Sequence, residues 1–187
     1  MRKIAALITM LIMLLSFSAC NAPAIEPEES PAPTATLEPQ ETIVFADPVL
    51  EAMVRGTMGK PDGAITAADA EAVTRLDLSS EWEQYTSGWM PIKGLSGLEY
   101  FKNLEYLDLS DHAITDVTPL AGLNKLTLLA LGGNPIADIA PLAGLTSLKM
   151  LILTDCAAQD YSPLAQLNGL ELLMLDNATI TDAAPLA

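Results

Sequence analysis

The sequence contains little of what enzymes and metalloproteins commonly use. Its 187 residues include one histidine and two cysteines, and only 5% are aromatic. No His/Cys set has the spacing of a metal site, and no glycine-rich phosphate loop occurs in the sequence. Nine basic residues face 24 acidic ones, which gives a formal net charge of −15. This charge argues against nucleic acid and anionic membrane surfaces as electrostatic partners. We therefore expect no nucleic-acid partner.

A long hydrophobic run occurs only at the N-terminus. Arg2 and Lys3 precede an apolar stretch at residues 4–17, which is short for a membrane span of about 20 residues. A positive start, an apolar run and small residues predict a secretory signal peptide. The ending Ser18-Ala19-Cys20 resembles a bacterial lipoprotein signal, although Phe17 stands where that family usually has an aliphatic residue.

This resemblance implies cleavage before Cys20, so that residues 1–19 are the signal peptide, and attachment of diacylglycerol to the Cys20 sulfur. The protein would then be held at the extracytoplasmic face of the membrane by its lipid alone. The alternative is an ordinary signal peptide that ends near a cysteine. Residues 20–42 are rich in Pro, Glu, Ala and Thr, a composition that predicts an extended, disordered tether.

Residues 43–73 have the pattern of an N-terminal helical cap. Asp47-Pro48 is a favourable helix start, and apolar residues from Leu50 to Met58 then recur on one face. Thr66 and Asp69 have capping-box spacing and predict a second helix that ends at Val73. Two short helices at this place would cover the first coil of a repeat array.

From Leu104 onward the sequence repeats with a period of 22 residues. The units begin at Leu104, Leu126, Leu148 and Leu170, and the last is incomplete. Each has the pattern L-x-x-L-x-L, which predicts a strand with inward leucines, followed by D-x-x-P-L-x-x-L. The proline predicts a 3₁₀ or extended return leg, because it cannot donate a backbone hydrogen bond.

An irregular coil precedes these units, so that the repeat region is residues 74–187. Its strand is predicted at residues 75–78, and its extra length carries Trp82, Tyr85 and Trp89. These aromatic residues are interpreted as packing over the cap or the first coil. The alternative is a binding loop, since Trp and Tyr are common in interface hot spots.

The repeat is a leucine-rich repeat, and its I-x-D-[I/V]-x-P-L spelling at residues 114–120 and 136–142 resembles the internalin type. The segment at residues 45–55 is similar to the N-terminal cap of many Gram-positive surface repeat proteins. The resemblance implies an α/β fold: a leucine-rich repeat solenoid with a curved parallel sheet, a short 3₁₀ or extended convex side and an N-terminal helical cap.

The family places Asn at the turn after each strand, where its amide bonds to neighbouring backbones. Here those positions are His112, Asn134, Cys156 and Ala178. We therefore expect an incomplete ladder, at a cost of about 1 kcal/mol for each buried group without a partner. The C-terminal half of the array is expected to be the looser half.

No residue pattern favours catalysis. Ser110, Asp111 and His112 are adjacent in sequence, but a catalytic triad requires convergence in space, and His112 is interpreted as a turn residue. Cys156 is expected to be a buried, small apolar residue. Asp116, Asp138, Asp160 and Asp182 form a column that could hold a cation, but such residues more often bond to their own turns. We predict no enzyme activity, no cofactor, no metal and no small-molecule substrate.

The outward-facing strand positions are predicted to form a protein-binding surface on the concave face. The candidate residues are Tyr106, Asp108, Leu128, Ala130, Met150, Ile152, Leu172 and Met174. The apolar members are expected to form a patch with a rim of Asp108, Asp111, Asp155 and Asp176. Alternatively, another part of the same chain covers them.

The sequence therefore predicts a non-catalytic surface module that binds an unidentified protein. Five strands at about 4.8 Å spacing offer roughly 200–300 Å², against about 800 Å² per partner in a standard interface, so that binding by these coils alone is expected to be weak. The alternative function is an accessory targeting region of a larger surface enzyme or adhesin that is truncated at Ala187.

Overall fold

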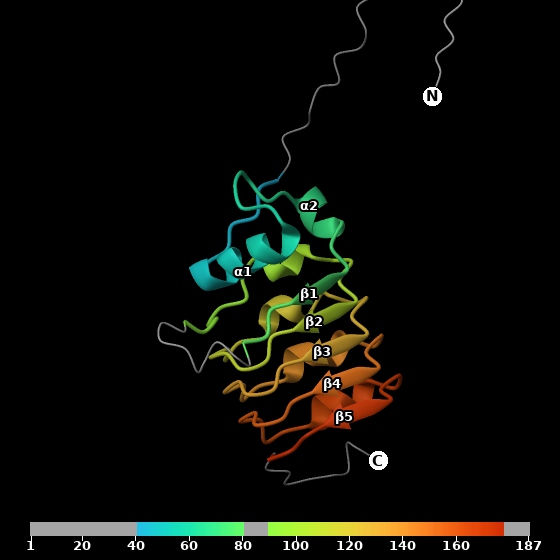
Figure 1. The fold of residues 1–187 in the computed structure, drawn as a ribbon. Coiled ribbons are helices and arrows are strands. Elements are labelled where there is room, and N and C mark those ends of the chain that lie inside the picture. The colour runs from blue at the N-terminus through green and yellow to red at the C-terminus, as the bar shows by residue number, and fades with distance from the viewer. Residues whose placement is uncertain (1–40, 81–89, 178–187) are drawn as a thin grey trace, which may run out of the picture. The chain divides into compact units, whose positions relative to one another are not determined.

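Five short strands lie side by side in one parallel sheet, in the order of the sequence. The computed structural model describes residues 41–80 and 90–177. The strands are β1 (Arg75–Asp77), β2 (Tyr106–Asp108), β3 (Leu128–Ala130), β4 (Met150–Ile152) and β5 (Leu172–Met174). Figure 1 shows them as consecutive steps from β1 to β5. The predicted leucine-rich repeat solenoid is confirmed.

The return legs are short 3₁₀ helices, as the prolines predict. They are η2 (Leu98–Tyr100), η3 (Thr118–Leu120), η4 (Ala140–Gly144) and η5 (Ser162–Gln166). In the last three, a proline occupies the first turn, where a missing N–H costs nothing and the fixed φ suits a helix. Consecutive return legs contact one another, as consecutive strands do.

The aspartate column belongs to these turns. One carboxylate oxygen of Asp116, Asp138 or Asp160 accepts a hydrogen bond from the backbone N–H two residues later, at 2.8 Å in each case. Hydrogen bonds from Thr118 lower the pKa of Asp116, and those from Ser162 lower the pKa of Asp160. The turn interpretation is therefore confirmed for these three residues, while Asp182 lies outside the described part of the chain.

Inward leucines and isoleucines fill the space between the sheet and the return legs. In the unit that begins at Leu126, both Leu129 and Leu131 are fully buried. In the unit that begins at Leu170, by contrast, Leu173 and Leu175 are only partly buried. One hydrophobic cluster runs from Ile43 to Leu167 and includes residues of the helical segment. Each coil therefore buries its apolar residues mainly against neighbouring coils.

Two helices lie beside β1, at one end of the sheet (Figure 1). They are α1 (Pro48–Met58) and α2 (Ala67–Glu71). Leu50 and Val54 on α1 are buried in the common core. Both predicted starts are confirmed, including the capping box between Thr66 and Asp69. However, α2 does not reach Val73 as predicted, because Ala72 closes it and the chain must extend to enter β1.

Asp47 joins the first helix to the first coil. Its Oδ1 accepts hydrogen bonds from the N–H groups of Val49 and Leu50, at 2.8 and 3.3 Å. Its Oδ2 accepts from Lys93 at 2.7 Å and from Gly94 at 3.0 Å. Burial of the carboxyl opposes ionisation, but these four hydrogen bonds outweigh it, and the pKa of Asp47 is lowered. One carboxylate thus satisfies amides from two segments that lie far apart in sequence.

Phe45 packs into the same junction. Its ring centroid lies 6.4 Å from that of Phe101, with the rings tilted by 52°. Gly97 has a φ of 107°, and a Cβ at this position would lie 2.6 Å from the Phe45 ring. Glycine is therefore required there both by the backbone conformation and by the close approach of the ring.

His112 takes part in the side-chain ladder together with Asn134. Asn134 donates from Nδ2 to the Leu109 carbonyl at 2.8 Å and accepts at Oδ1 from the Ile114 N–H at 3.0 Å. One coil earlier, the Nε2 of His112 lies 2.6 Å from the Leu78 carbonyl, and Nδ1 accepts from the Ile92 N–H at 3.3 Å. His112, which was interpreted as a turn residue at a ladder position, thus fills the same role as Asn134, because a neutral imidazole also offers one donor and one acceptor.

Cys156 fills half of the same role. Its buried thiol donates to the Leu131 carbonyl at an Sγ–O distance of 3.5 Å, while the Ile136 N–H bonds to the Asn134 carbonyl instead. Burial raises the pKa of the Cys156 thiol to about 11, which keeps the proton that this bond requires. The fourth ladder position, Ala178, lies outside the described residues, and the looser C-terminal half stays a prediction.

The two backbone hydrogen bonds of His112, one donated and one accepted, predict a specific pH dependence. Burial, the largest effect, lowers the pKa of His112 below 6.5 in the folded state. Below about pH 6.5 the unfolded chain therefore takes up a proton that the folded chain does not, and the free energy of unfolding falls as the pH decreases toward the folded pKa. In His112→Asn, the ladder is kept and this slope is expected to vanish.

Urea unfolding between pH 7.5 and 5 measures this effect. Asp47, Asp116 and Asp160 have lowered pKa values, so their contribution is lost only below about pH 3.8 and leaves this window clear. Because His112 is the one histidine of the chain, no other imidazole contributes. An equal slope for the wild type and His112→Asn would contradict the assignment.

Asp47→Ala is expected to lower the free energy of unfolding by about 3 kcal/mol, since it removes a helix cap and leaves four amides without their charged acceptor. Asp62→Ala is the matched control, because Asp62 is exposed and forms no hydrogen bond or ion pair with a described residue. Denaturant midpoints of the two variants would be compared at pH 7. The joining role of Asp47 would be refuted by equal midpoints.

Candidate functional site

The strand register places the predicted binding residues on one face of the sheet. Tyr106 lies opposite Leu128, Leu128 opposite Met150, and Met150 opposite Leu172. A second row contains Asp108, Ala130, Ile152 and Met174, in the same order across the strands. The intervening residues, such as Leu129, point into the core. Arg75 and Asp77 of β1 begin the two rows, and we call the surface that the rows form the outer strand face. Its part on β3, β4 and β5 is apolar.

Exposure along this apolar part rises toward β5. The side chains of Leu128, Met150 and Ile152 are partly exposed. On β5, Leu172 is 44% and Met174 is 37% exposed, so both count among the exposed large hydrophobic residues of the described chain. A group of neighbouring apolar side chains with this exposure is typical of an interaction surface.

Ala130 differs from its prediction. Its position in the second row is as expected, but it is only 2% exposed. Its neighbours across the sheet are the longer side chains of Asp108 and Ile152, and nearby space is tight as well: a Cβ on Gly132 would meet the Thr154 hydroxyl at 2.8 Å. Ala130 therefore offers almost no surface to a partner.

The β1–β2 end of the face is charged and aromatic. The Arg75 guanidinium lies over the Tyr106 ring, 3.4 Å from its centroid, and 3.2 Å from an Asp77 carboxylate oxygen. Burial, the largest effect, and the charges of Asp77 and Asp108 raise the pKa of Tyr106. Arg75 opposes this shift. Arg75 is not among the predicted binding residues, and its contact with Tyr106 depends on the pairing of β1 with β2.

Aspartates border the face where the strands end. Asp108 closes β2 and accepts the Ser110 N–H at Oδ1, at 2.9 Å. Three residues farther along, Asp111 has a φ of 63°, and its equivalent Asp155 has a φ of 56°. Asp155 also accepts a hydrogen bond from Asn177 Nδ2 at 2.8 Å. Since the strands are parallel, these residues share one edge of the sheet, which we call the carboxyl edge.

The left-handed backbone at this edge recurs after each strand from β2 to β5. It occurs at Asp111, Gly133, Asp155 and Asn177, which are spaced by the 22-residue period. Asp, Asn and Gly are the residues that tolerate this conformation best. At Gly133 a Cβ would also overlap the Asp111 carboxylate. Asp111 and Asp155 are among the predicted rim residues, but their left-handed conformation was not predicted, although Asp, Gly and Asn recur at this position every 22 residues.

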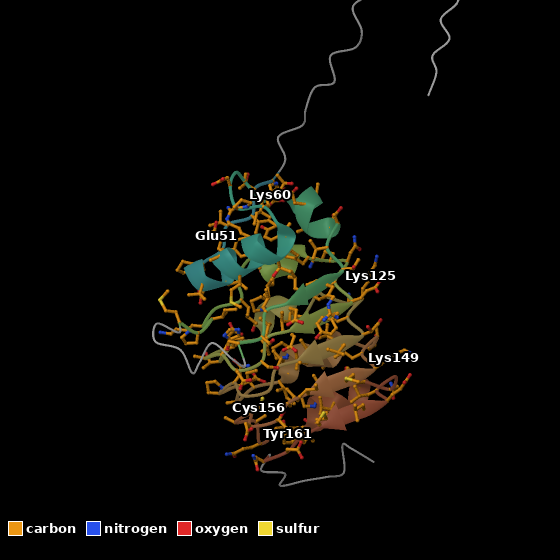
Figure 2. The ribbon with its side chains drawn as sticks, in the orientation of Figure 1. Glu51, Lys60, Lys125, Lys149, Cys156 and Tyr161 are labelled. Carbon is orange, nitrogen blue, oxygen red and sulfur yellow. The ribbon has the colours of Figure 1, made fainter. Side chains whose placement is uncertain are left out.

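Lysines lie at the opposite, amino edge of the strands. Lys125 and Lys149 precede β3 and β4, and Figure 2 shows both at the same side of the sheet, away from Cys156 and Tyr161. Lys125 Nζ donates to Asn103 Oδ1 at 2.7 Å, and Lys149 Nζ lies 3.0 Å from Glu171 Oε1. Glu105 and Glu171 precede β2 and β5 at this same edge, which therefore carries charges of both signs, whereas aspartates border the carboxyl edge.

A separate hollow of about 410 Å³ lies at the helical end. Met58, Lys60 and Asp69 contribute to its lining. Lys60 Nζ lies 2.5 Å from Asp69 Oδ2, and this hydrogen bond, followed by those from Thr66, lowers the pKa of Asp69 to about 2. These polar groups already satisfy one another in the cap of α2, so they do not indicate a ligand.

Several predicted sites lie outside the described residues. They are the lipidation site Cys20 and the aromatic residues Trp82, Tyr85 and Trp89. The predicted boundaries of the signal, tether, cap and repeats likewise stay predictions. In the part of the chain that the structure describes, no group of three or more His, Cys, Asp or Glu side chains is arranged to hold a metal ion. Within the same ranges, no helix has the length and apolarity to cross a membrane.

Comparison with solved structures identifies the type of repeat. No protein-family model matches the sequence, nor does any curated protein. Internalin C2 of Listeria monocytogenes is 36% identical, with a TM-score of 0.70, over 80% of this chain and 64% of its own. The internalin InlF of the same species is 34% identical, with a TM-score of 0.70, over 82% of this chain and 43% of its own.

A third structure, the functional domain of L. monocytogenes InlJ, includes a cysteine ladder and shares the fold alone, at 20% identity and a TM-score of 0.59. It aligns over 75% of this chain and 34% of its own. The chain thus spans less than two thirds of each of these three relatives. Its repeat spelling, its register and its likeness to two internalins agree: the chain is an internalin-type leucine-rich repeat protein.

Proposed function

We propose that this chain is a non-catalytic surface module that binds a protein partner through the outer strand face. The single observation that carries the proposal is the exposed apolar part of that face. Leu172 and Met174 are 44% and 37% exposed, beside partly exposed Met150 and Ile152. These side chains occupy outward strand positions, and none of them belongs to the hydrophobic core cluster. A partner that covers them would remove this apolar surface from water, which makes a favourable contribution to the free energy of binding.

The arrangement of polar groups also favours binding over catalysis. His112, the one imidazole of the chain, is buried, and both of its nitrogens bond to the backbone. The Cys156 thiol is buried and has a raised pKa, so it is a poor nucleophile. These observations support a binding role without a cofactor or a small-molecule substrate.

Met150→Asn with Ile152→Asn tests the face. Peptides selected from a displayed random library on the wild-type chain are expected to bind this double variant about ten-fold more weakly, because polar amides replace apolar contacts. Fluorescence anisotropy of synthesised peptides measures the loss. Both side chains are partly exposed, so that the melting temperature is expected to change little.

Ala121→Asn with Ala165→Asn is the matched control. Both alanines are exposed at the return legs, away from the strands. This variant is expected to keep the wild-type affinity. The proposed function would be refuted if the selected peptides bound both double variants equally well.

We further propose that the chain is held at the extracytoplasmic membrane face by diacylglycerol on Cys20. The support is the signal pattern of residues 1–20, with Cys20 directly after Ser18-Ala19. The tether at residues 20–42 would place the repeats away from the bilayer, by roughly 65 Å at about 3 Å per residue if fully extended.

The alternative function, in which these repeats target a larger surface enzyme or adhesin, is also compatible with the fact that the chain covers only part of each internalin.

Cys20→Ser is expected to abolish incorporation of radiolabelled fatty acid in a bacterial host and to move the chain from the membrane to the soluble fraction. Cys156→Ala is the control, since this cysteine is buried and is predicted to receive no lipid. Fatty acid retained in Cys20→Ser would exclude Cys20 as the attachment site. An ordinary signal peptide would instead leave the wild type without label.

A further inference from the structure

The outer strand face has its apolar area on β3, β4 and β5 and its negative charge along the carboxyl edge. Met150, Ile152, Leu172 and Met174 lie on the strands themselves. Asp155 and Asp176 follow two of these strands, and Asp108 and Asp111 occupy the corresponding edge at β2. The face therefore presents an apolar area with a row of carboxylates along one side, and the lysines lie at the other side.

These carboxylates are available to a partner. No lysine, arginine or histidine of the described ranges forms an ion pair with Asp108, Asp111, Asp155 or Asp176. By contrast, Asp77 on β1 is paired with Arg75. Asp108 and Asp155 each use Oδ1 for a hydrogen bond within the protein, and that bond holds the carboxylate in place. A cation that approached this edge would gain attraction without first breaking an ion pair.

We infer that the partner is a protein segment with lysine or arginine residues along one side of an apolar ridge. This inference rests on the proposed function and adds the chemistry and the orientation of the partner to it. The apolar ridge covers Met150, Ile152, Leu172 and Met174, and the basic residues lie along the carboxyl edge. In the reverse orientation those basic residues would lie at the amino edge, where Lys149 is already paired with Glu171, and would lose the unpaired carboxylates of the carboxyl edge.

Charge also argues against a second copy of this chain as the occupant. The formal net charge of −15 opposes self-association, and two copies would bring unpaired carboxylates toward one another or toward lysines that are already bonded. The small area of five strands adds a reason for electrostatic support, because hydrophobic contact over a few hundred Å² alone binds weakly. A basic amphipathic segment supplies both kinds of contact.

Two synthetic helical peptides of equal length test the inference. They have the same leucine positions, with lysine at the flanking positions of one and glutamate in the other. The lysine peptide is expected to bind the purified chain about ten-fold more tightly at low salt, and this advantage is expected to shrink at high salt, where screening is strong. Fluorescence anisotropy measures both affinities.

Asp111→Asn with Asp155→Asn is expected to remove most of this advantage. Asparagine tolerates the left-handed backbone, and Asn177 already occupies the equivalent position with a φ of 59°. Asp116→Asn with Asp138→Asn is the matched control: it removes the same charge, but from the turns of the return legs, and an amide oxygen can still accept the turn hydrogen bond. The control is expected to change the affinity by less than about two-fold.

The outcomes separate the two proposals. The inference of a basic partner is overturned if the two peptides bind with equal affinity, or if the two Asp→Asn pairs change the affinity equally. The binding face itself stands in that case if Met150→Asn with Ile152→Asn still lowers the affinity for both peptides. If that variant binds both peptides as well as the wild type, the proposed face is wrong. A dimer in sedimentation velocity that the same variant dissociates would make a second copy the occupant and overturn the basic partner.

Discussion

A coil of 22 residues cannot bury its own apolar side chains, and this constraint governs the structure. Each three-residue strand is too short to be stable alone, and each return leg is a 3₁₀ helix of only three or five residues. Stacking solves both problems, because the inward leucines of one coil pack on those of the next while the strands pair. Where stacking begins, α1 supplies Leu50 and Val54 to the same hydrophobic cluster. Asp47 then links that helix to the first coil through four backbone amides.

Stacking also requires partners for the backbone groups between coils. The structure meets this need with different side chains, provided that each supplies suitable hydrogen-bonding atoms. Asn134 uses its amide, and His112 uses the two nitrogens of a neutral ring. Cys156 supplies a donor alone, and the Ile136 N–H finds a carbonyl within its own coil. The position therefore selects for hydrogen-bonding geometry in a buried site, and a fixed amino acid is not required.

The outer strand face is free of these demands, and its composition differs for that reason. Packing dictates Leu at inward positions such as Leu129, whereas outward positions vary from Arg75 to Met174. This variation is ordered in space: charged and aromatic side chains lie on β1 and β2, and apolar ones lie on β3 to β5. Exposed Leu172 and Met174 contribute nothing to the core, so their apolar character favours a role in contact with another molecule.

The sequence by itself determined the repeat, the strand positions, the register and the helix caps. It could do so because the 22-residue period recurs in successive coils and because capping depends only on residues that are close together in sequence. Only the tertiary structure decided which side chains in those positions are exposed to a partner and which form hydrogen bonds between segments. Ala130 is covered by its neighbours, His112 is drawn into the ladder, and Asp47 meets amides of residues 93 and 94. Each of these outcomes depends on contacts between segments distant in sequence, and such contacts are set by how coils stack rather than by any single coil.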